Sequence, residues 1–251
     1  MQGKMKSIAV YSLKGGVGKT TIAVILAWAA ATVSKRRTLL WDLDGQAAAT
    51  FLLGGAGEGA GEAQAVFARE VSPTRLIRPT DIEGLDLLPA DTSLWGLDRL
   101  LFGLGKKKRL EKLVDRLGGD YERIVLDCPP GLTETSEQVL RAADVVIVPV
   151  IPSPLSQRAL AEVVAYLDRH QIRRGAILPV YNMADRRRSM HLAALEAHPD
   201  WPVVPMASAI EAMSSGGDAV GRIGQRTPAG EALSGLWTAI ERRLARTSKA
   251  D

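Results

Sequence analysis

The chain has 251 residues, of which 46% are hydrophobic, and this length and composition suit a single α/β domain spanning residues 1–251. Its 32 Lys and Arg residues against 28 Asp and Glu residues give a formal net charge of +4, which permits a polyanionic partner without requiring one. The single cysteine, Cys128, excludes an internal disulfide and a cysteine-rich metal site within one chain. We expect Cys128 to be a small buried hydrophobic residue.

No segment of the sequence predicts export or a membrane span. The N-terminal stretch MQGKMKSIAVYSL resembles a signal peptide only briefly, because Lys14 follows before a long hydrophobic segment or a cleavage site can form. The longest apolar run, residues 21–33, is too short to cross a bilayer and suits a buried helix. We therefore expect a soluble, cytoplasmic protein.

Short apolar runs alternate along the chain with longer segments of helical periodicity. Strands are predicted at residues 7–13, 38–44, 85–90, 123–130, 144–151, 176–182 and 201–206. Helices are predicted at residues 19–34, 108–118, 134–142, 156–170, 188–198 and 228–247. The alternation predicts an α/β fold, with a doubly wound, mostly parallel sheet that carries helices on both faces. Ligands bind such sheets at the carboxyl ends of the strands.

Three segments have a biased composition. Residues 54–65, GGAGEGAGEAQA, predict a mobile loop after the second strand. The dense basic clusters are KKKR at residues 106–109 and RRR at residues 186–188. Such clusters are more often solvated faces than binding sites.

The segment KGGVGKTT at residues 14–21 has the pattern of a phosphate-binding loop. It follows a predicted strand and opens a predicted helix, where free backbone N–H groups and the positive helix end attract phosphate oxygens. We expect Lys19 to reach the β and γ phosphates, the Thr20 hydroxyl to bind Mg²⁺ and Thr21 to donate to a phosphate. The predicted nucleotide contacts are Lys14, Gly15, Gly16, Val17, Gly18, Lys19, Thr20 and Thr21.

The loop departs from the simple pattern G-x-x-x-x-G-K-[ST], because Leu13 stands at the first glycine position and Lys14 lies near the phosphates. In this respect it resembles the deviant Walker A motif of the ParA/MinD family of P-loop NTPases. The resemblance implies that Lys14 reaches across a dimer interface to the ATP of the other subunit. Such a cation would stabilise charge that develops on the γ-phosphoryl group, so Lys14 and Lys19 would both be catalytic and dimerisation would depend on ATP.

Carboxylates at the ends of neighbouring predicted strands can complete a site for ATP and Mg²⁺. Asp127 resembles the family's Walker B aspartate, which would act on Mg²⁺ through water. Asp42 and Asp44 are two residues apart on a predicted strand and are expected to face the same side. They resemble the family's DxDPQ segment, which implies that Asp44 positions the hydrolytic water and Asp42 supports the metal shell. Either aspartate could instead cap a turn. The sequence departs from that segment at Gly45, where proline is common, and at Ala48, where a polar residue often stands.

Two later residues resemble the family's base contacts. Asn182 ends a predicted strand, like the base-contacting asparagine of the MinD branch. Pro205 follows the last predicted strand and resembles the proline that lines the adenine pocket. The resemblance as a whole covers about residues 6–246, and its most specific parts are the phosphate loop and the two aspartate segments.

The ParA branch implies a positioning cycle. An ATP-dependent sandwich dimer would bind DNA non-specifically, and a ParB-like or cargo-adaptor protein would stimulate hydrolysis and release, so that a plasmid, a chromosome or another cargo is segregated. Such a protein would associate with the nucleoid. The resemblance places the DNA surface in the C-terminal part of the chain, and the cluster at residues 186–188 is a second candidate. The candidate DNA-binding residues are Arg222, Arg226, Arg242, Arg243 and Arg246.

Several alternatives remain open. Arginines on the last predicted helix could simply form its solvated face, since an apolar stripe occupies another side. A MinD-like ATPase would use a C-terminal amphipathic tail on a membrane surface, but the stripe overlaps the helix that should pack on the fold, so we regard a membrane role as the weaker reading. An iron–sulfur carrier of the superfamily would need cysteines that this chain lacks. A biosynthetic amidoligase would need a second substrate pocket, for which the sequence shows no motif.

Overall fold

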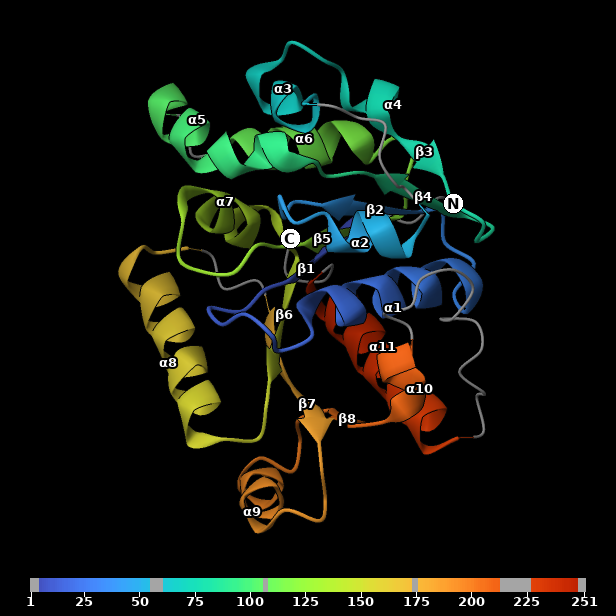
Figure 1. The fold of residues 1–251 in the computed structure, drawn as a ribbon, viewed down its shortest axis with the longest axis vertical. Helices are drawn as coiled ribbons and strands as arrows, with labels where there is room; N and C mark the ends of the chain where they lie inside the picture. Colours follow the sequence, from blue (N-terminus) through green and yellow to red (C-terminus); the bar gives the residue numbers. More distant parts are fainter. Residues whose placement is uncertain (1–4, 55–60, 106–107, 173–175, 213–226, 248–251) are drawn as a thin grey trace.

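The computed structural model describes residues 5–54, 61–105, 108–172, 176–212 and 227–247. Eight strands form one sheet in the order β3-β4-β2-β5-β1-β6-β7-β8, and Figure 1 shows helices on both sides of it. The neighbouring strands run parallel except at the β3–β4 edge, where the pairing is antiparallel. The predicted doubly wound, mostly parallel fold is therefore confirmed.

The strands are short and their residues are mostly buried. Their bounds are β1 Lys6–Val10, β2 Thr38–Asp42, β3 Arg78–Pro79, β4 Leu85–Leu88, β5 Arg123–Asp127, β6 Val145–Val150, β7 Ala176–Ala184 and β8 Val203–Pro205. All residues of the central strands β1, β2, β5 and β6 are buried, because helices cover both of their faces.

The helices are of unequal length, and the long ones other than α5 match the predicted periodic segments. The long helices are α1 Lys19–Thr32, α5 Leu97–Leu104, α6 Arg109–Leu117, α7 Glu134–Ala142, α8 Pro154–Arg169, α9 Ser189–Ala197 and α11 Pro228–Thr247. The short elements are α2 Ala48–Leu52, α3 Ala63–Ala68, α4 Pro73–Leu76, the 3-10 helix η1 Thr92–Gly96 and α10 Ser208–Glu211. Side-chain caps mark the N-termini of two of these helices. Thr133 and Ser136 form a capping box at α7, and Ser153 followed by Pro154 opens α8.

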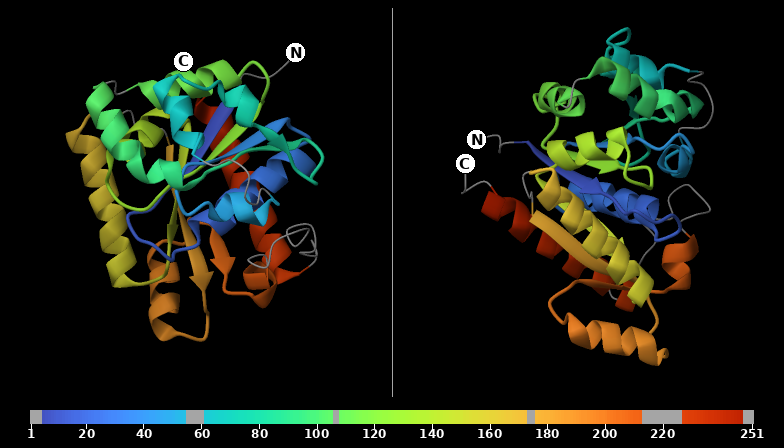
Figure 2. Two further views of the ribbon diagram at one scale, coloured as in Figure 1. Left: turned by 45° about the horizontal axis from the view of Figure 1, so that its top comes forward. Right: turned by 90° about the vertical axis from the view of Figure 1, so that its left-hand side faces the viewer.

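Two hydrophobic clusters lie on opposite faces of the sheet. One packs Leu39, Trp41 and Leu126 of the strands against the side of α3, α5, α6, α7 and α8. The other packs Ile8, Val10 and neighbouring strand residues against α1 and α11. The views in Figure 2 show this three-layer arrangement, which leaves the strand ends as the accessible edges of the sheet.

Three sequence predictions need correction. The second strand ends at Asp42, so Asp44 lies in the following turn and not on the strand with Asp42. The predicted mobile loop at 54–65 is too long, because residues 63–65 form the first turn of α3. Residues 55–60 of that loop lie outside the described part. The short elements α2, α3, α4, β3, η1 and α10 and the eight-residue helix α5 were not predicted, because segments of a turn or two carry little periodicity.

Candidate nucleotide-binding site

The phosphate loop connects β1 to α1 at the centre of the sheet, where β1 lies between β5 and β6. Gly16 and Gly18 have φ angles of 74° and 81°, which glycine adopts without strain. Gly18 is the N-cap of α1, and no side chain caps the helix there. The first backbone N–H groups of α1 are therefore suited to an anionic ligand.

Lys19 is held inside the loop. Its side chain is buried, and its Nζ donates to the backbone oxygen of Lys14 at 3.2 Å. Burial lowers the pKa of the amine, and the negative charge of Asp127 opposes that shift. An ammonium group in this position would gain from contact with phosphate oxygens.

Asp127 is a buried carboxylate without a hydrogen-bond partner. It ends β5 with 1% exposure, and neither of its oxygens receives a hydrogen bond within the described residues. Burial, followed by the charge of Asp42, raises its pKa well above the usual range, while the Thr20 hydroxyl and the Lys19 charge oppose the rise. Such a group is stabilised by a cation or by the water that the cation holds.

These residues fit a magnesium–nucleotide site. The described residues contain no cluster of three or more His, Cys, Asp or Glu side chains able to hold a metal by themselves. A Mg²⁺ ion would therefore depend on phosphate oxygens and water, as it usually does in nucleotide sites. Thr20 and Asp127 are the residues that would hold it from the protein side.

Asp42 is held by hydrogen bonds in this structure, and its role in the metal shell stays a prediction. Its Oδ2 accepts hydrogen bonds from the backbone N–H and the hydroxyl of Thr50, at 2.9 and 2.8 Å, and its Oδ1 accepts from the Asp44 N–H at 3.1 Å. Burial raises the pKa of Asp42 to about 6, and the hydrogen bonds from Thr50 counteract part of that rise. Thr50 was not singled out in the sequence, because its contact with Asp42 forms only when α2 folds back onto β2.

Asp44 lies in a tight turn beside the loop. Its Oδ1 accepts from the Gln46 N–H at 3.0 Å, and its backbone oxygen accepts from the Ala47 N–H at 2.8 Å. Ala47 has a φ of 53°, an uncommon value for a residue other than glycine. The Asp44 charge acts on both Lys19 and Asp127, so its carboxylate belongs to the same site. The catalytic role of Asp44 stays a prediction.

The surroundings of Gly45 explain why this chain has glycine where the family's DxDPQ segment has proline. It is buried, and a Cβ atom at this position would lie 2.2 Å from Cδ1 of Trp95. A proline there would collide with the indole ring. Trp95 was not predicted to approach the site, because it belongs to η1 and is distant from Gly45 in the sequence.

Asn182 supports the phosphate loop. Its Nδ2 donates to the backbone oxygen of Val17 at 2.8 Å, and a Cβ on Gly18 would lie 2.4 Å from the same nitrogen. The pairing of β7 with β8 shifts register between Tyr181 and Ala184, and this irregularity surrounds Asn182. Base contact by Asn182 and by Pro205, the half-buried last residue of β8, stays a prediction.

Cys128 follows Asp127 and is buried with 1% exposure, as expected for a small apolar residue. Burial raises its thiol pKa well above the ordinary value, with a smaller contribution from the Asp127 charge.

The candidate DNA-binding arginines have different environments. Arg222 and Arg226 lie outside the described residues. Arg242 and Arg246 are exposed on α11, whereas Arg243 is half-buried and donates from Nη2 to the Ile177 oxygen at 3.3 Å. Arg243 is therefore engaged with β7 and is a weak candidate for a free surface cation.

The arginines also lie at opposite edges of the sheet. The C-terminal half of α11 contacts the first residues of β5 and β7, through Glu241 and Arg243. Arg242 and Arg246 therefore lie at the edge away from the phosphate loop. Residues 186–188 follow the carboxyl end of β7, at the loop's edge, and Arg187 pairs there with Asp185 at 2.9 Å.

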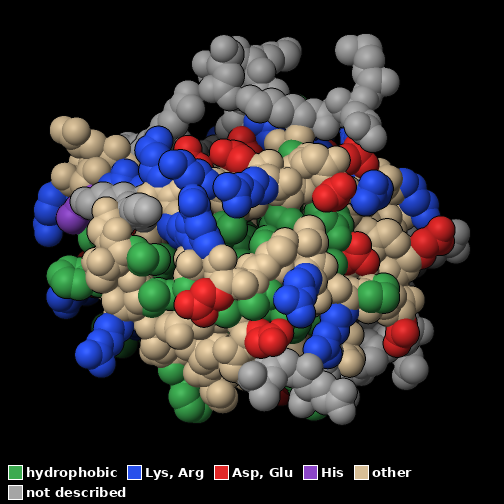
Figure 3. Space-filling view, turned by 90° about the horizontal axis from the view of Figure 1, so that it is seen from above, with side chains coloured by type: hydrophobic (Ala, Val, Ile, Leu, Met, Phe, Trp, Pro, Cys, Tyr) green, Lys and Arg blue, Asp and Glu red, His purple; other side chains and the backbone are tan. Residues whose placement is uncertain are grey.

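A further basic region lies at the end of α3 and on α6. Figure 3 views the molecule from the side of α3, α4, α5 and α6, and Lys and Arg side chains gather on part of this face. Arg69, Lys112 and Arg116 are exposed, but Arg109 is buried and its Nε donates to the Phe67 oxygen at 2.8 Å. The expectation that residues 106–109 form a solvated face is thus wrong for Arg109, while Lys106 and Lys107 lie outside the described part.

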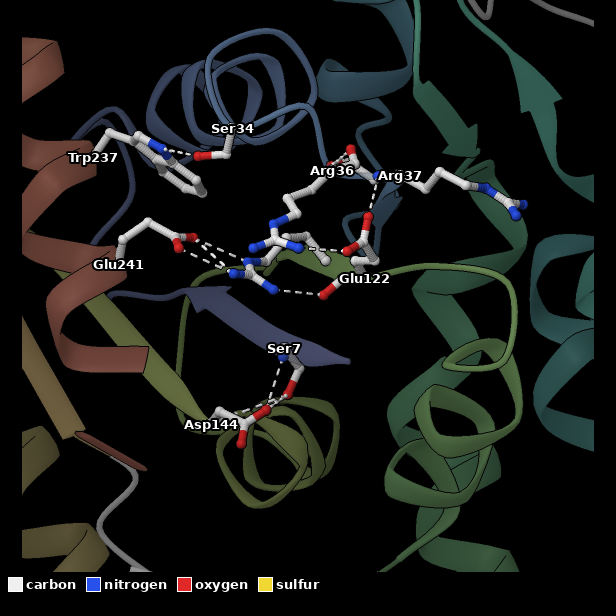
Figure 4. A network of polar contacts seen from close by, with 10 residues as sticks. Ser7, Ser34, Arg36, Arg37, Glu122, Asp144, Trp237 and Glu241 are labelled. Atoms are coloured by element: carbon white, nitrogen blue, oxygen red, sulfur yellow. Dashed lines mark hydrogen bonds and ion pairs between the residues drawn. The ribbon is translucent and has the colours of Figure 1, made fainter. Parts of the chain in front are cut away.

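The last helix is built into the fold. Leu236, Trp237, Ile240 and Leu244 are buried in the cluster that covers β1. Trp237 donates from Nε1 to the Ser34 hydroxyl at 2.9 Å, and Glu241 accepts from the Arg123 guanidinium at 3.0 and 3.1 Å. Figure 4 shows Trp237 and Glu241 directed from α11 toward these contacts. The apolar stripe of α11 is therefore core. No helix within the described ranges has the length and apolar character of a membrane span.

A family model described as an AAA domain matches residues 5–178, which include the phosphate loop and the aspartate segments. The chain belongs to the ParA/MinD family of P-loop ATPases. Within it, the sporulation initiation inhibitor protein Soj of Bacillus subtilis (strain 168) is 36% identical over 149 residues, 58% of each chain. A ParA family protein of Chlamydia trachomatis is 33% identical over 166 residues, 65% of each chain. The chain thus matches about three fifths of the length of these curated relatives.

Solved structures similar to this chain share its whole fold. The structure of apo McdA from Cyanothece has a TM-score of 0.80 at 23% identity and covers 96% of this chain and 99% of its own. Cobyrinic acid a,c-diamide synthase from Mycobacterium smegmatis, with a bound ATP analogue and magnesium, has a TM-score of 0.76 at 27% identity and covers 95% of this chain and 94% of its own. Membership of this family supports ATPase activity and the binding of nucleotide and magnesium.

Proposed function

We propose that this chain is a ParA-like ATPase that forms an ATP-dependent sandwich dimer, binds DNA non-specifically and positions a cargo. The observation that carries the nucleotide part is the unpartnered carboxylate of Asp127, buried beside the Lys19 ammonium at the base of the phosphate loop. Magnesium would supply charge neutralisation at the phosphates, with Thr20 and Asp127 on the protein side. Relatives described as chromosome partitioning proteins ParA support the positioning part.

Lys14 supports the dimer part of the proposal. It lies half-exposed in the loop, its backbone oxygen accepts from Lys19, and its own amine has no hydrogen-bond or ion-pair partner among the described residues. A lysine at the rim of the nucleotide site can reach outward to a second subunit. There its charge would stabilise the γ-phosphoryl group during transfer to water.

In the remaining steps, Asp44 orients the attacking water after its turn adjusts, and hydrolysis separates the subunits. A ParB-like or cargo-adaptor protein would accelerate that step. DNA binding would rest on arginine contacts with phosphates, so the protein would be found on the nucleoid.

Retention on non-specific duplex DNA tests this function. The protein is loaded with ADP or with a slowly hydrolysed ATP analogue, and binding is measured across a salt series. We expect retention only with the ATP analogue and a steep loss as salt rises. Equal retention in both nucleotide states, or none in either, would contradict the cycle.

Paired variants locate the DNA surface. Replacement of Arg242 and Arg246 by glutamate should weaken retention by about tenfold or more and reduce the salt dependence. The matched comparison replaces Arg69, which directly follows α3, and Arg116, which lies on α6. A larger effect in the second pair would move the DNA surface to that face, and ATP binding should be the same in both.

Two other activities are less well supported. A MinD-like membrane role would need a free amphipathic helix, but the apolar side of α11 is buried in the fold. A diamide synthase activity is suggested by the similarity to the Mycobacterium smegmatis enzyme. That activity would make ATP turnover depend on an added nitrogen donor and a carboxylic acid, whereas the ParA-like function predicts turnover without either.

A further inference from the structure

An exposed tryptophan lies against the turn that carries the proposed catalytic aspartate. Trp95 is 72% exposed, one of the most exposed large apolar side chains in the described part of the molecule. The edge of its indole nevertheless faces Gly45. A Cβ atom on Gly45 would lie 2.2 Å from Cδ1 and 2.6 Å from Nε1 of Trp95, closer than any side chain could be accommodated. The ring thus occupies the space of a side chain at position 45.

Hydrogen bonds of Asp42 and Asp44 hold the turn that this indole contacts. Asp42 accepts from the Asp44 N–H, and Asp44 accepts from the N–H groups of Gln46 and Ala47. The positive φ of Ala47 shows that this tight path is not the relaxed conformation of an alanine. Contacts around residues 42–47, here called the Asp44 turn, therefore determine where the Asp44 carboxylate points.

The backbone that carries Trp95 is itself fixed. Asp91 accepts from the Ser93 N–H at 2.8 Å and from the N–H groups of Glu62 and Ala63 at 3.1 Å, so it joins η1 to α3. The Ala90 N–H donates at 2.9 Å to the hydroxyl of Thr50, which itself donates to Asp42. The strand end before η1 and the Asp44 turn are therefore connected through one buried hydroxyl.

We propose that Trp95 is a positioning residue for ATP hydrolysis: its indole packs on Gly45 and sets the Asp44 turn in the arrangement from which Asp44 directs water to the γ-phosphate. This inference rests on the proposed ATPase function. It predicts that Gly45 and Trp95 are energetically coupled, because one residue must be small where the other is large. It also predicts that Trp95 affects turnover more than nucleotide binding, since the phosphate loop does not contact it in the described contacts.

A double-mutant cycle tests the coupling. Gly45→Ala alone should push the indole away and lower kcat by about tenfold, because a displacement of about 1 Å at a reacting group is costly. Trp95→Ala alone should lower kcat by a similar factor, with KM for ATP unchanged within about twofold. The combination Gly45→Ala with Trp95→Ala should be more active than Gly45→Ala, because the collision is gone. Strictly multiplicative effects of the two changes would overturn the proposal.

The matched control is Phe102→Ala. Phe102 is 81% exposed on α5, the helix that follows η1, and it has no described contact with the Asp44 turn. Its removal should leave kcat unchanged. Trp95→Phe should retain more activity than Trp95→Ala, since a smaller ring still covers Gly45. Equal loss in Phe102→Ala and Trp95→Ala would also contradict the proposal.

Tryptophan fluorescence gives a readout that a purely structural role would not change. Of the other four tryptophans, Trp41 and Trp237 are buried and Trp28 and Trp201 are half-buried. A change of emission on adding the ATP analogue with Mg²⁺ should therefore be smaller in Trp95→Phe than in the unaltered protein, and the difference reports on Trp95. An undiminished change in that variant would count against movement at Trp95. Calorimetric binding of ATP is measured in parallel. If the unaltered protein does not bind ATP, the ATPase function is contradicted. If it binds and hydrolyses ATP but Gly45 and Trp95 are not energetically coupled, this inference alone is contradicted.

Discussion

At the scale of single residues, the site combines groups whose protonation depends on the ligand. Asp127 and Lys19 are both buried. Among the charges that act on each of them, the other has the strongest favourable effect on its ionised form. The fold leaves the Asp127 carboxylate without hydrogen bonds, since neither of its oxygens has a partner among the described residues. A functional site that costs stability is a common arrangement, because the ligand repays the cost on binding.

Asp127→Asn tests this arrangement. The change removes a buried, unpartnered carboxylate, so the nucleotide-free protein should unfold at the same temperature or higher. Binding of Mg²⁺–ATP should weaken by about tenfold or more, because the amide is a poor partner for the metal's water shell. Thermal unfolding and calorimetry with and without Mg²⁺ give the two readouts. Undisturbed magnesium dependence in the variant would contradict the role of Asp127.

Asp42 gives a prediction about pH. Its pKa is raised from 3.8 to about 6 in the folded chain, so the native state binds the proton more tightly than the unfolded state. Its contribution to stability is therefore greatest below pH 4 and is lost as pH rises from about 4 to about 6. The difference in the free energy of unfolding between the unaltered protein and Asp42→Asn, measured by urea unfolding without nucleotide, should change across this window. A constant difference from pH 4 to 7 would refute the prediction.

At the scale of elements, α11 is positioned by both apolar and ionic contacts. Its buried stripe covers the face of the sheet that also carries α1. The Arg123 guanidinium is almost fully buried, and it donates from Nε and Nη2 to the Glu241 carboxylate and from Nη1 to the Glu122 backbone oxygen at 2.9 Å. Loss of one partner would leave a buried cation with fewer acceptors.

Glu241→Gln measures that contribution. The side chain of Glu241 is 31% exposed, so solvent screens part of the interaction, and we expect a loss of about 1–2 kcal/mol in the free energy of unfolding. Glu231→Gln is the matched control on the exposed side of the same helix. Equal stability of the two variants in urea unfolding would show that the Arg123 contact contributes nothing measurable.

At the scale of the whole molecule, the phosphate loop, the Asp44 turn and residues 186–188 share one edge of the sheet, while Arg242 and Arg246 lie at the other. In the proposed sandwich dimer the loop edges of two subunits face each other. The arginines of α11 would then remain outside the interface and free for DNA. The proposed dimer interface and the proposed DNA surface are therefore compatible in one molecule.

Lys14→Ala tests the dimer. The variant should bind ATP normally but lose partner-stimulated turnover by at least about 100-fold, because the charge from the second subunit is missing. Asp44→Ala is the comparison, since it should accumulate an ATP-bound dimer that hydrolyses slowly. Light scattering with ATP and a phosphate-release assay distinguish the two variants. Normal stimulated turnover in Lys14→Ala would remove the argument for a lysine acting between subunits.

Much of the fold could be predicted from the sequence, because the buried strands are continuous apolar runs and the long helices repeat their apolar pattern over several turns. The predicted helix at 228–247 has the bounds of α11, the predicted strands contain β2, β4, β5, β6 and β8, and they overlap most of β1 and β7. The phosphate loop could be predicted for a different reason. Its chemistry is local, since the glycines, Lys19 and Thr20 act within one turn of chain between a strand and a helix.

Other features were decided only by the tertiary structure. The sequence could not show that Asp42 would be bound by Thr50, that Asn182 would support Val17, or that an indole from η1 would occupy the space beside Gly45. Each of these contacts joins segments that are distant in the chain or separated by a turn with no periodic signal. Local propensity therefore determined the elements and the phosphate loop of this protein, while the packing of those elements determined which polar groups remained available for a ligand.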